Sequence, residues 1–297
     1  MRITLKTQYH YLLMLIPGLI LLLLFEVIPL FGSVLAFQNY IPGVPFADQE
    51  WVGLDNFEYM FLMGDSKIIF GNTIFIASMK IFFNLLIPLF FALLLNEVRS
   101  VVMKRWVQTI LYLPHFLSWV ILAGILTEIL SLNGIVNQML KFFHFEPIMF
   151  LAKNSWFPGI IIGSDVWKDL GFNLVIYLAA LAGINPSLYE AAEVDGASRF
   201  QRIWYITLPG ISSTVILLAT LGIANFLNAG FDQIFNLYNP AVYQSGDIID
   251  TYVYRAGLLQ MQYSLATALG LLKSVLSFIL IIVAYTVANR FNDYRIF

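Results

Sequence analysis

Residues 185–209 read NPSLYEAAEVDGASRFQRIWYITLP, a polar interruption in an otherwise apolar chain. Two residue pairs in it have the spacing of a capping box, which marks the start of a helix: Ser187 with Glu190, and Ser198 with Gln201. Between the pairs lies Gly196, which can adopt a positive φ, end one helix and let the chain reverse. The stretch therefore predicts two short capped helices joined by a tight turn, and Pro209 is expected to close the second helix.

The composition around this loop is typical of an integral membrane protein. Hydrophobic residues make up 60% of the chain, charged residues only 11%, and the mean hydropathy is +0.80. A helix needs about 20 apolar residues to cross a bilayer, and six stretches fit that length: about 11–37, 70–95, 107–130, 157–182, 211–237 and 266–288. We expect an all-α polytopic membrane protein in which residues 1–297 form one transmembrane domain.

The first apolar stretch resembles a signal peptide, because Arg2 and Lys6 precede it. Its apolar run, Tyr11–Phe37, is longer than the core of about 7–15 residues that a signal peptide has, so we expect an uncleaved first span. The chain has no cysteine, which excludes disulfides and thiol catalysis.

The basic residues of the loops predict the orientation of the spans. With the N-terminus in the cytoplasm, nine basic residues face the cytoplasm and four face outward. The nine are Arg2, Lys6, Arg99, Lys104, Arg105, Arg199, Arg202, Arg290 and Arg295, and the four are Lys67, Lys141, Lys153 and Arg255. This excess obeys the positive-inside rule. It places both termini and the 185–209 loop in the cytoplasm.

The loop also carries a family pattern. Glu190-Ala191-Ala192, Gly196, Ile206 and Leu208-Pro209 match EAA-x3-G-x9-I-x-LP at every position. The chain thereby resembles the integral-membrane permeases of bacterial ABC importers. Residues 108–120 (QTILYLPHFLSWV) and 231–254 (FDQIFNLYNPAVYQSGDIIDTYVY) resemble the oligosaccharide or polysaccharide branch of the maltose-type permeases. The resemblance runs from about Leu12 to the end of the chain.

The resemblance implies a type I importer fold, a multi-pass location in the bacterial cytoplasmic (inner) membrane, and a set of partners. These are a second, homologous permease in a heterodimer, two cytoplasmic nucleotide-binding subunits, an extracytoplasmic solute-binding protein and an oligosaccharide; no nucleic-acid partner is expected. In such permeases the loop serves as a coupling helix that enters a groove of the ATPase subunit. The implied coupling residues are Tyr189, Glu190, Ala191, Ala192, Asp195, Gly196 and Arg199.

The residues themselves favour a mechanical role for the loop over a catalytic one. Its carboxylates lie on a surface turn, and it has no cysteine or histidine. Apolar side chains along it require a partner surface: Leu188, Tyr189, Ala191, Ala192, Phe200, Ile203 and Trp204. The chain also lacks a P-loop, since Gly270-Leu-Leu-Lys-Ser274 has no glycine before the lysine. We therefore expect no catalytic residue and no cofactor here, with ATP and Mg²⁺ bound by the partner ATPase.

Polar residues within the apolar spans are the candidates for a substrate pathway. Asn225, Asn228, Asp232 and Asn236 have the spacing i, i+3, i+7 and i+11, which places them on one face of a continuous helix. A polar stripe in a lipid-embedded helix must face protein or water, and asparagine both donates hydrogen bonds to sugar hydroxyls and accepts them. Hydrogen bonding between helices is the alternative.

The fourth span adds a charged cluster to these candidates. Asp165, Lys168 and Asp169 lie within little more than one turn, with Lys168 three residues from Asp165 and close enough for a local ion pair. Pairing with Lys80, Glu128 or Lys273 of other spans is also open, as is contact with cargo. Trp167, Lys168 and Asn173 are the pathway candidates from this span. His10, His115 and His144 have no spacing that predicts a metal site.

Three functions remain to be distinguished. The first is a permease of a sugar-importing ABC system, which needs an ATPase and a binding protein. The second is an ABC permease for another solute, such as an amino acid, a peptide or a polyamine. The third is a stand-alone secondary carrier or a membrane enzyme that works without ATP. The resemblance favours the first.

Overall fold

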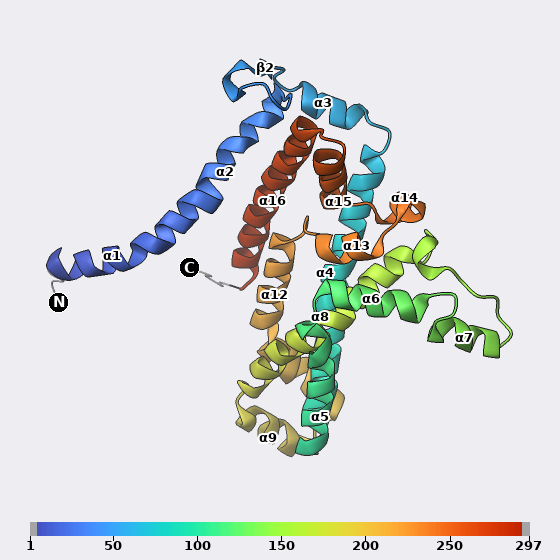
Figure 1. Ribbon diagram of the computed structural model, residues 1–297. Helices are drawn as coiled ribbons and strands as arrows, with labels where there is room; N and C mark the ends of the chain where they lie inside the picture. Colours follow the sequence, from blue (N-terminus) through green and yellow to red (C-terminus); the bar gives the residue numbers. More distant parts are fainter. Residues whose placement is uncertain (1–4, 293–297) are drawn as a thin grey trace. The chain divides into compact units, whose positions relative to one another are not determined.

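The computed structural model describes residues 5–292, and helices make up most of them (Figure 1). The described chain divides into two compact units, and each is considered by itself. Unit 1 consists of the residues up to Gly64 together with Tyr252–Leu272, and unit 2 of Asp65–Thr251 together with the residues from Lys273 onward. Arg2 and Arg295, two of the charges that predict the orientation, lie outside the described residues.

Unit 1 begins with a long helical segment and continues into a small hairpin. Its elements are α1 (Leu5–Leu22), the π-turn η1 (Leu23–Val27), α2 (Ile28–Leu30), the 3-10 segment η2 (Phe31–Phe37), β1 (Gln38–Asn39), η3 (Phe46–Asp48), β2 (Glu50–Trp51) and α3 (Asp55–Leu62). The π-turn η8 (Arg255–Leu259) and the first turns of α16 (Tyr263–Asn292) complete it. Strands β1 and β2 are antiparallel, and Gln38 pairs with Trp51.

Unit 2 holds the remaining elements. They are α4 (Ser66–Glu97), α5 (Val101–Tyr112), η4 (Leu113–Phe116), α6 (Trp119–Leu130), α7 (Ile135–Phe142), η5 (Phe150–Ala152), α8 (Phe157–Ala182), α9 (Pro186–Val194), α10 (Arg199–Arg202), the π-turn η6 (Ile203–Thr207), α11 (Leu208–Gly210), α12 (Ser212–Ala224), α13 (Phe231–Leu237), η7 (Pro240–Val242) and α14 (Tyr243–Gly246). Helix α15 (Ile249–Tyr254) begins in unit 2 and ends in unit 1.

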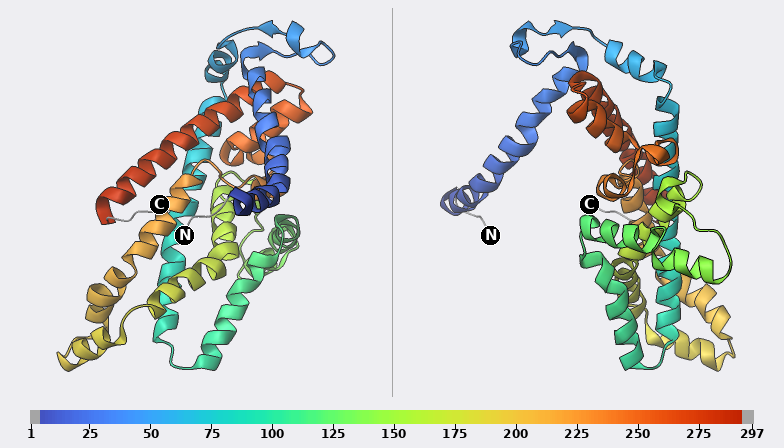
Figure 2. Two further views of the ribbon diagram at one scale, coloured as in Figure 1. Left: turned by 90° about the vertical axis from the view of Figure 1, so that its left-hand side faces the viewer. Right: turned by 45° about the vertical axis from the view of Figure 1, so that its right-hand side comes forward.

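The core of unit 2 is built on α4 and α8, which run side by side (Figures 1 and 2). Two apolar clusters join them. One cluster contains Ile76, Ala77, Ala123, Phe157, Ile161, Ala229, Ile234, Leu237, Val242 and Ile248, and the other contains Ala92, Leu95, Leu174, Tyr177, Leu181 and Ile211. Between the two clusters lie the polar side chains of Lys80 and Asn84 on α4 and of Ser164, Asp165 and Asp169 on α8. They form a polar layer between two apolar ones.

The lengths and compositions of the helices agree with a polytopic membrane protein. Among the described residues four helical segments are long and apolar enough to cross a bilayer: Tyr11–Phe37, Ser66–Glu97, Trp119–Phe142 and Tyr263–Thr286. Two bent pairs raise the number to six if each is one span: Phe157–Ala182 with Pro186–Val194, and Arg199–Gly210 with Ser212–Ala224. The side chains of residues 11–30 are nearly all exposed, as is expected of a segment that contacts lipid or another subunit.

The predicted third span, 107–130, is not one continuous helix. Helix α5 ends at Tyr112, and α6 begins at Trp119 with Ser118 as its N-cap. Pro114 causes the break, because it has no N–H to donate to the preceding turn. Lys168 of α8 stabilises the break by donating from Nζ to the backbone carbonyls of His115 and Leu117, at 2.8 Å each.

The predicted fifth span, 211–237, is divided as well. Helix α12 ends at Ala224, residues 225–230 are not helical, and α13 begins at Phe231. Gly230 has a φ of +95°, a value that interrupts a right-handed helix and that glycine adopts at little cost. The prediction that Asn225, Asn228, Asp232 and Asn236 share one helical face is therefore wrong.

Close packing of α5 against α8 depends on Gly171. A Cβ atom at this position would collide with the Leu111 carbonyl and lie 2.7 Å from Cα of Tyr112. We expect Gly171→Ala to lower the free energy of unfolding by about 1–3 kcal/mol, because the two backbones must separate. Thermal denaturation of the purified protein in detergent measures the change.

Gly163→Ala is the matched control in the same helix, since no atom lies within 4 Å of its Cβ position. Alanine is the better helix former, so this variant should be as stable as the wild type or more stable. Equal effects of the two substitutions would contradict the packing argument.

Candidate functional site

The 185–209 loop forms two helical segments at one end of unit 2. Helix α9 ends in a Schellman arrangement, in which the N–H of Ala197 donates to the carbonyl of Ala192 at 2.9 Å and the N–H of Gly196 donates to that of Glu193 at 3.1 Å. Gly196 has a φ of +77°. The prediction that this glycine ends the first helix through a positive φ is confirmed.

The start of the second helical segment is also as predicted. The N–H of Gln201 donates to Oγ of Ser198 at 3.3 Å, and the N–H of Ser198 donates to Oε1 of Gln201 at 2.8 Å, which is a complete capping box. The segment extends through the π-turn η6 to Gly210, one residue beyond Pro209, and bends by 58° into α12.

The capping box predicted for Ser187 and Glu190 is wrong. Asn185 is the N-cap of α9, and its Oδ1 accepts the N–H of Ser187 at 3.1 Å. Pro186 occupies the first helical position, for which its fixed φ is suited. Ser187 is therefore already inside the helix.

Side chains connect the two segments to each other and to the end of α4. The hydroxyls of Tyr189 and Thr207 are 3.0 Å apart, and Arg202 lies 3.5 Å from the carboxylate of Glu193. Arg199 lies 4.0 Å from Glu97, the last residue of α4. Figures 1 and 2 show α9 at this end of α4, and α14 lies near the other end, where Asn72 donates to the carbonyl of Gln244 at 3.2 Å.

The loop presents an apolar surface to its surroundings. Of the predicted apolar residues, Leu188, Ala191, Phe200 and Trp204 are exposed, and Tyr189, Ala192 and Ile203 are half-buried. Val194 and Tyr205 extend the exposed set, with 89% and 79% of their surface accessible. Glu190 and Asp195 are exposed beside them. So much exposed apolar surface on a short loop indicates a protein-binding surface.

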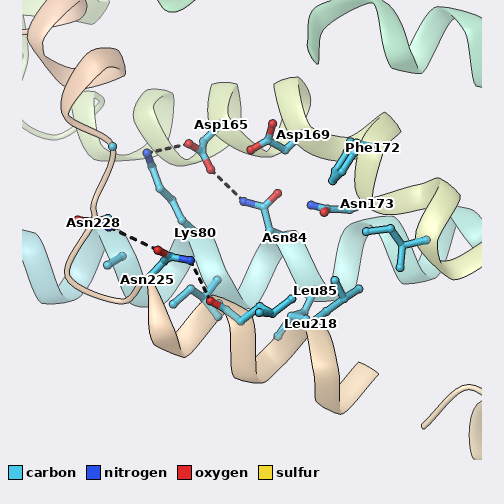
Figure 3. A pocket seen from close by; sticks show the side chains of 16 residues that line it. Lys80, Asn84, Leu85, Asp165, Asp169, Phe172, Asn173, Leu218, Asn225 and Asn228 are labelled. Carbon is cyan, nitrogen blue, oxygen red and sulfur yellow. Dashed lines mark hydrogen bonds and ion pairs between the residues drawn. The ribbon is translucent and has the colours of Figure 1, made fainter. Parts of the chain in front are cut away.

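A second feature of unit 2 is a cavity of about 440 Å³ between α4, α8 and α12 (Figure 3). Its polar lining comes from one lysine, two aspartates and four asparagines: Lys80, Asp165, Asp169, Asn84, Asn173, Asn225 and Asn228. Phe172, Leu85, Leu218 and Leu221 are among the apolar residues that line it. A mainly apolar cavity with a few convergent polar groups is the usual form of a small-molecule site.

Lys80 holds the polar layer of the bundle together. Its Nζ donates to the carbonyl of Ala229 at 2.8 Å and to Oε1 of Gln233, and it forms an ion pair with Asp165 at 2.8 Å. An ammonium group has three hydrogens, so these three acceptors saturate it. Gly230 makes the approach possible, because a Cβ there would lie 2.6 Å from Nζ.

Other polar side chains of the layer also form hydrogen bonds or ion pairs. Asn84 donates to Oδ2 of Asp165 at 2.9 Å (Figure 3), and Gln233 donates to Oγ of Ser164 at 2.8 Å. Nδ1 of His115 lies 3.1 Å from Asp169. Of the pairings that the sequence left open for Asp165, the one with Lys80 forms. The local pair with Lys168 does not form, because the ammonium of Lys168 is occupied by the carbonyls at the break between α5 and α6.

The structure separates the predicted pathway residues into two groups. Asn173, Asn225 and Asn228 line the cavity. Trp167, Lys168, Asp232 and Asn236 do not line it, and Asp232 and Asn236 lie on α13, beyond the break at Gly230. Lys273, a possible partner of the cluster in α8, pairs instead with Asp250 at 2.5 Å and donates to Oδ1 of Asn228 at 2.8 Å.

Sequence reasoning missed Asn84 and Gln233 as members of this site. Asn84 is a single amide in an apolar stretch, and that isolation is the signal the sequence contains for it. Gln233 lies between Asp232 and Asn236, the two polar residues that the helical spacing selected instead. Among the described residues there is no group of three or more His, Cys, Asp or Glu residues that could bind a metal ion.

Comparison with known proteins gives this geometry a family. Residues 84–293 match the model of the family described as "binding-protein-dependent transport system inner membrane component". The chain belongs to this family. The permease is 42% identical to Protein LplB of Bacillus subtilis over 99% of its own length and 92% of LplB. It is 40% identical to the polygalacturonan/rhamnogalacturonan transport system permease protein YteP of the same species, over 99% of its length and 92% of YteP.

Solved structures agree with the fold of the permease. A chain of a bacterial ABC transporter that imports the acidic polysaccharide alginate superposes with a TM-score of 0.90 and 38% identity, over 97% of each chain. A chain of a bacterial alginate ABC transporter in complex with alginate pentasaccharide-bound periplasmic protein gives a TM-score of 0.89, also at 38% identity, over 96% of each chain. The chain is thus an all-α membrane permease with an ABC importer fold.

We expect Lys80→Met to lower the free energy of unfolding by about 3–5 kcal/mol, because it leaves the buried Asp165 carboxylate without its counter-ion. Adding Asp165→Asn should restore part of the loss, since the remaining group is then neutral. Equilibrium denaturation of the permease in detergent, arranged as a double-mutant cycle, measures the coupling. Lys67→Met, at an exposed position of the same helix, is the control and should change little.

Proposed function

We propose that this permease forms half of the translocation pathway of an ATP-driven, binding-protein-dependent importer of oligosaccharides. The coupling role assigned to the 185–209 loop rests on two capped helical segments, α9 and the segment that begins with α10, which present the residues of the EAA pattern. The choice of cargo is supported by the relatives, whose names refer to polygalacturonan, rhamnogalacturonan and galactooligosaccharide transport. The amide-lined cavity agrees with such a cargo.

The loop is suited to transmit movement because the turn between its two helical segments is fixed. The Schellman end at Gly196 and the capping box at Ser198 satisfy the backbone groups on both sides of the turn, and the contact between Tyr189 and Thr207 connects the two segments. A partner that binds Glu190, Ala191 and the exposed apolar residues would move α9 and α10 as one body. The ion pair between Arg199 and Glu97 would link that movement to α4.

The partners of the permease follow from this role. Because the sequence has no P-loop, ATP and Mg²⁺ are bound by two cytoplasmic nucleotide-binding subunits. A homologous permease supplies the second half of the pathway in a heterodimer, and a solute-binding protein delivers cargo from outside. Both termini and the coupling loop face the cytoplasm, in keeping with the positive-inside rule.

The cavity of unit 2 is the proposed cargo contact of this subunit. Its only lysine has all three hydrogens committed and is 6% exposed, so it has no hydrogen left for a ligand. The amide of Asn173, by contrast, has no hydrogen bond within the described part of the chain. Amides that both donate and accept are suited to hydroxyl groups, and Phe172 offers an aromatic face beside them.

The conformation at Gly196 provides a test of coupling. We expect Gly196→Val to abolish most of the ATPase stimulation by loaded binding protein, because a β-branched residue is strained at positive φ by at least about 1–2 kcal/mol. Gly196→Asn should retain much of it, since asparagine tolerates this conformation. The assay uses the complete transporter in nanodiscs, and size-exclusion chromatography confirms assembly. Stimulation of the valine variant at the wild-type level would contradict the coupling role.

The two groups of pathway candidates allow a matched comparison. We expect Asn173→Ala with Asn225→Ala to reduce oligosaccharide uptake into proteoliposomes about tenfold, a loss of roughly 1.4 kcal/mol in cargo stabilisation. Asp232→Ala with Asn236→Ala removes the same number of polar groups outside the cavity and should leave uptake near the wild-type level. The reverse result would place the pathway on α13. Uptake without ATP would indicate a secondary carrier.

A further inference from the structure

A second cavity, of about 280 Å³, lies in unit 1. One wall comes from the hairpin and α3, residues 39–59, and the other from residues 261–265, where α16 begins. The orientation expected from the positive-inside rule places both segments on the extracytoplasmic side of the membrane. No residue of this cavity belongs to the coupling loop or to the cavity of unit 2.

The two walls are fixed to each other. The N–H of Tyr40 donates to Oγ of Ser264 at 2.9 Å, and the rings of Tyr40 and Tyr263 meet edge to face with their centroids 5.7 Å apart. Met261 has a φ of +58°, which is uncommon for a residue with a side chain, and the next N–H, of Gln262, donates to the carbonyl of Ala256 at 2.9 Å. The second wall is thus held in one conformation.

The hairpin that forms the first wall is equally ordered. Gln49 is 4% exposed and fills the turn, accepting the N–H of Ile41 at 2.8 Å and donating to the carbonyls of Ile41 and Val44. Asn56 fixes α3 to the strand by donating to the carbonyls of Ala36 and Gln38. A cavity with rigid walls costs little ordering entropy when a ligand binds.

The lining combines aromatic rings with neutral amides. It contains three tyrosines and three amides, Tyr40, Tyr59, Tyr263, Asn39, Asn56 and Gln262, and no charged side chain. The three phenol hydroxyls and the amides of Asn39 and Gln262 form no hydrogen bond with the described residues. Tyr59 is 57% exposed, so its ring is accessible. These are unused donors and acceptors beside flat apolar faces.

This chemistry selects the class of ligand. An anion would find no cation in the cavity, a cation would find no carboxylate, and a purely apolar ligand would leave the amides and hydroxyls unpaired at a cost. A pyranose ring has apolar C–H faces that pack on aromatic rings and hydroxyls that pair with amides. The volume of about 280 Å³ lies just below the range of about 300–1,000 Å³ that is typical of ligand pockets, and suits one sugar unit.

We propose that this cavity is an outer subsite that binds one sugar unit of the cargo on the extracytoplasmic side. The inference rests on the proposed function, because the ligand is a unit of the transported oligosaccharide. The bound unit is held by stacking on Tyr59 and by hydrogen bonds to Gln262 and Asn39. Such a contact favours longer oligosaccharides, which can occupy this subsite with a unit that short ones lack.

Saturation-transfer NMR on the complete transporter in detergent, without binding protein, tests the subsite directly. The probes are the disaccharide and the hexasaccharide of the cargo series that the wild-type transporter takes up with ATP. Irradiation of aromatic protons should transfer saturation to the hexasaccharide, and Tyr59→Ala with Gln262→Ala should reduce the transfer at least threefold. Tyr59→Phe keeps the ring and should retain most of it. Gln138→Ala removes an exposed amide elsewhere and is the control.

Uptake assays separate the possible outcomes. The double variant should lose several-fold more hexasaccharide uptake than disaccharide uptake. Unchanged saturation transfer in the double variant would overturn the proposed subsite. A double variant that no longer docks the binding protein but still contacts the sugar would overturn it too, because the cavity would then be a protein-docking surface. If the wild-type transporter takes up no oligosaccharide with ATP, the proposed function itself fails, and that result is distinct from a failure of the subsite.

Discussion

A buried lysine with three acceptors holds unit 2 together. A charged side chain inside an apolar bundle is expensive unless its charge and its hydrogens are all paired. Lys80 meets this condition with a carboxylate from α8, a backbone carbonyl from the link between α12 and α13, and an amide from α13. The acceptors come from two regions of the sequence, Asp165 and residues 229–233. The position of one side chain therefore fixes α4, α8 and the 229–233 segment relative to one another.

This constraint explains the shape of the chain around it. The link between α12 and α13 must bring the carbonyl of Ala229 to the ammonium, and only a residue without a side chain fits at Gly230. The interruption of the fifth predicted span is thus part of the arrangement that satisfies the lysine. The same link carries Asn225 and Asn228 to the wall of the cavity. A single electrostatic requirement therefore shapes both the core and the candidate binding site.

The parts of the fold that local chemistry determines could be predicted from the sequence. The positive φ of Gly196 and the capping box of Ser198 depend on residues within a few positions, and both predictions are confirmed. The prediction failed where distant residues decide. Helical spacing predicted four polar residues on one helical face. The helix instead breaks before Gly230, where Lys80, 150 positions earlier, occupies the space that a side chain at Gly230 would need. A local pair of Lys168 with Asp165 was possible from the spacing, but Lys168 donates instead to the carbonyls of His115 and Leu117 at the break between α5 and α6. One prediction also failed on local grounds: Asn185 and not Ser187 is the N-cap of α9, because Pro186 occupies the first helical position.

The three hydrogen bonds of the Lys80 ammonium have a consequence for proton leakage across the membrane. Ionisable side chains in series inside a membrane protein can pass protons from one to the next, and a bacterium depends on its proton gradient for energy. An ammonium whose hydrogens all point at fixed acceptors has none left to offer to water in the cavity, and its small exposed surface limits contact with solvent. Lys80 can therefore hold the core together without donating a proton to the cavity, while the amides beside it remain available to a solute.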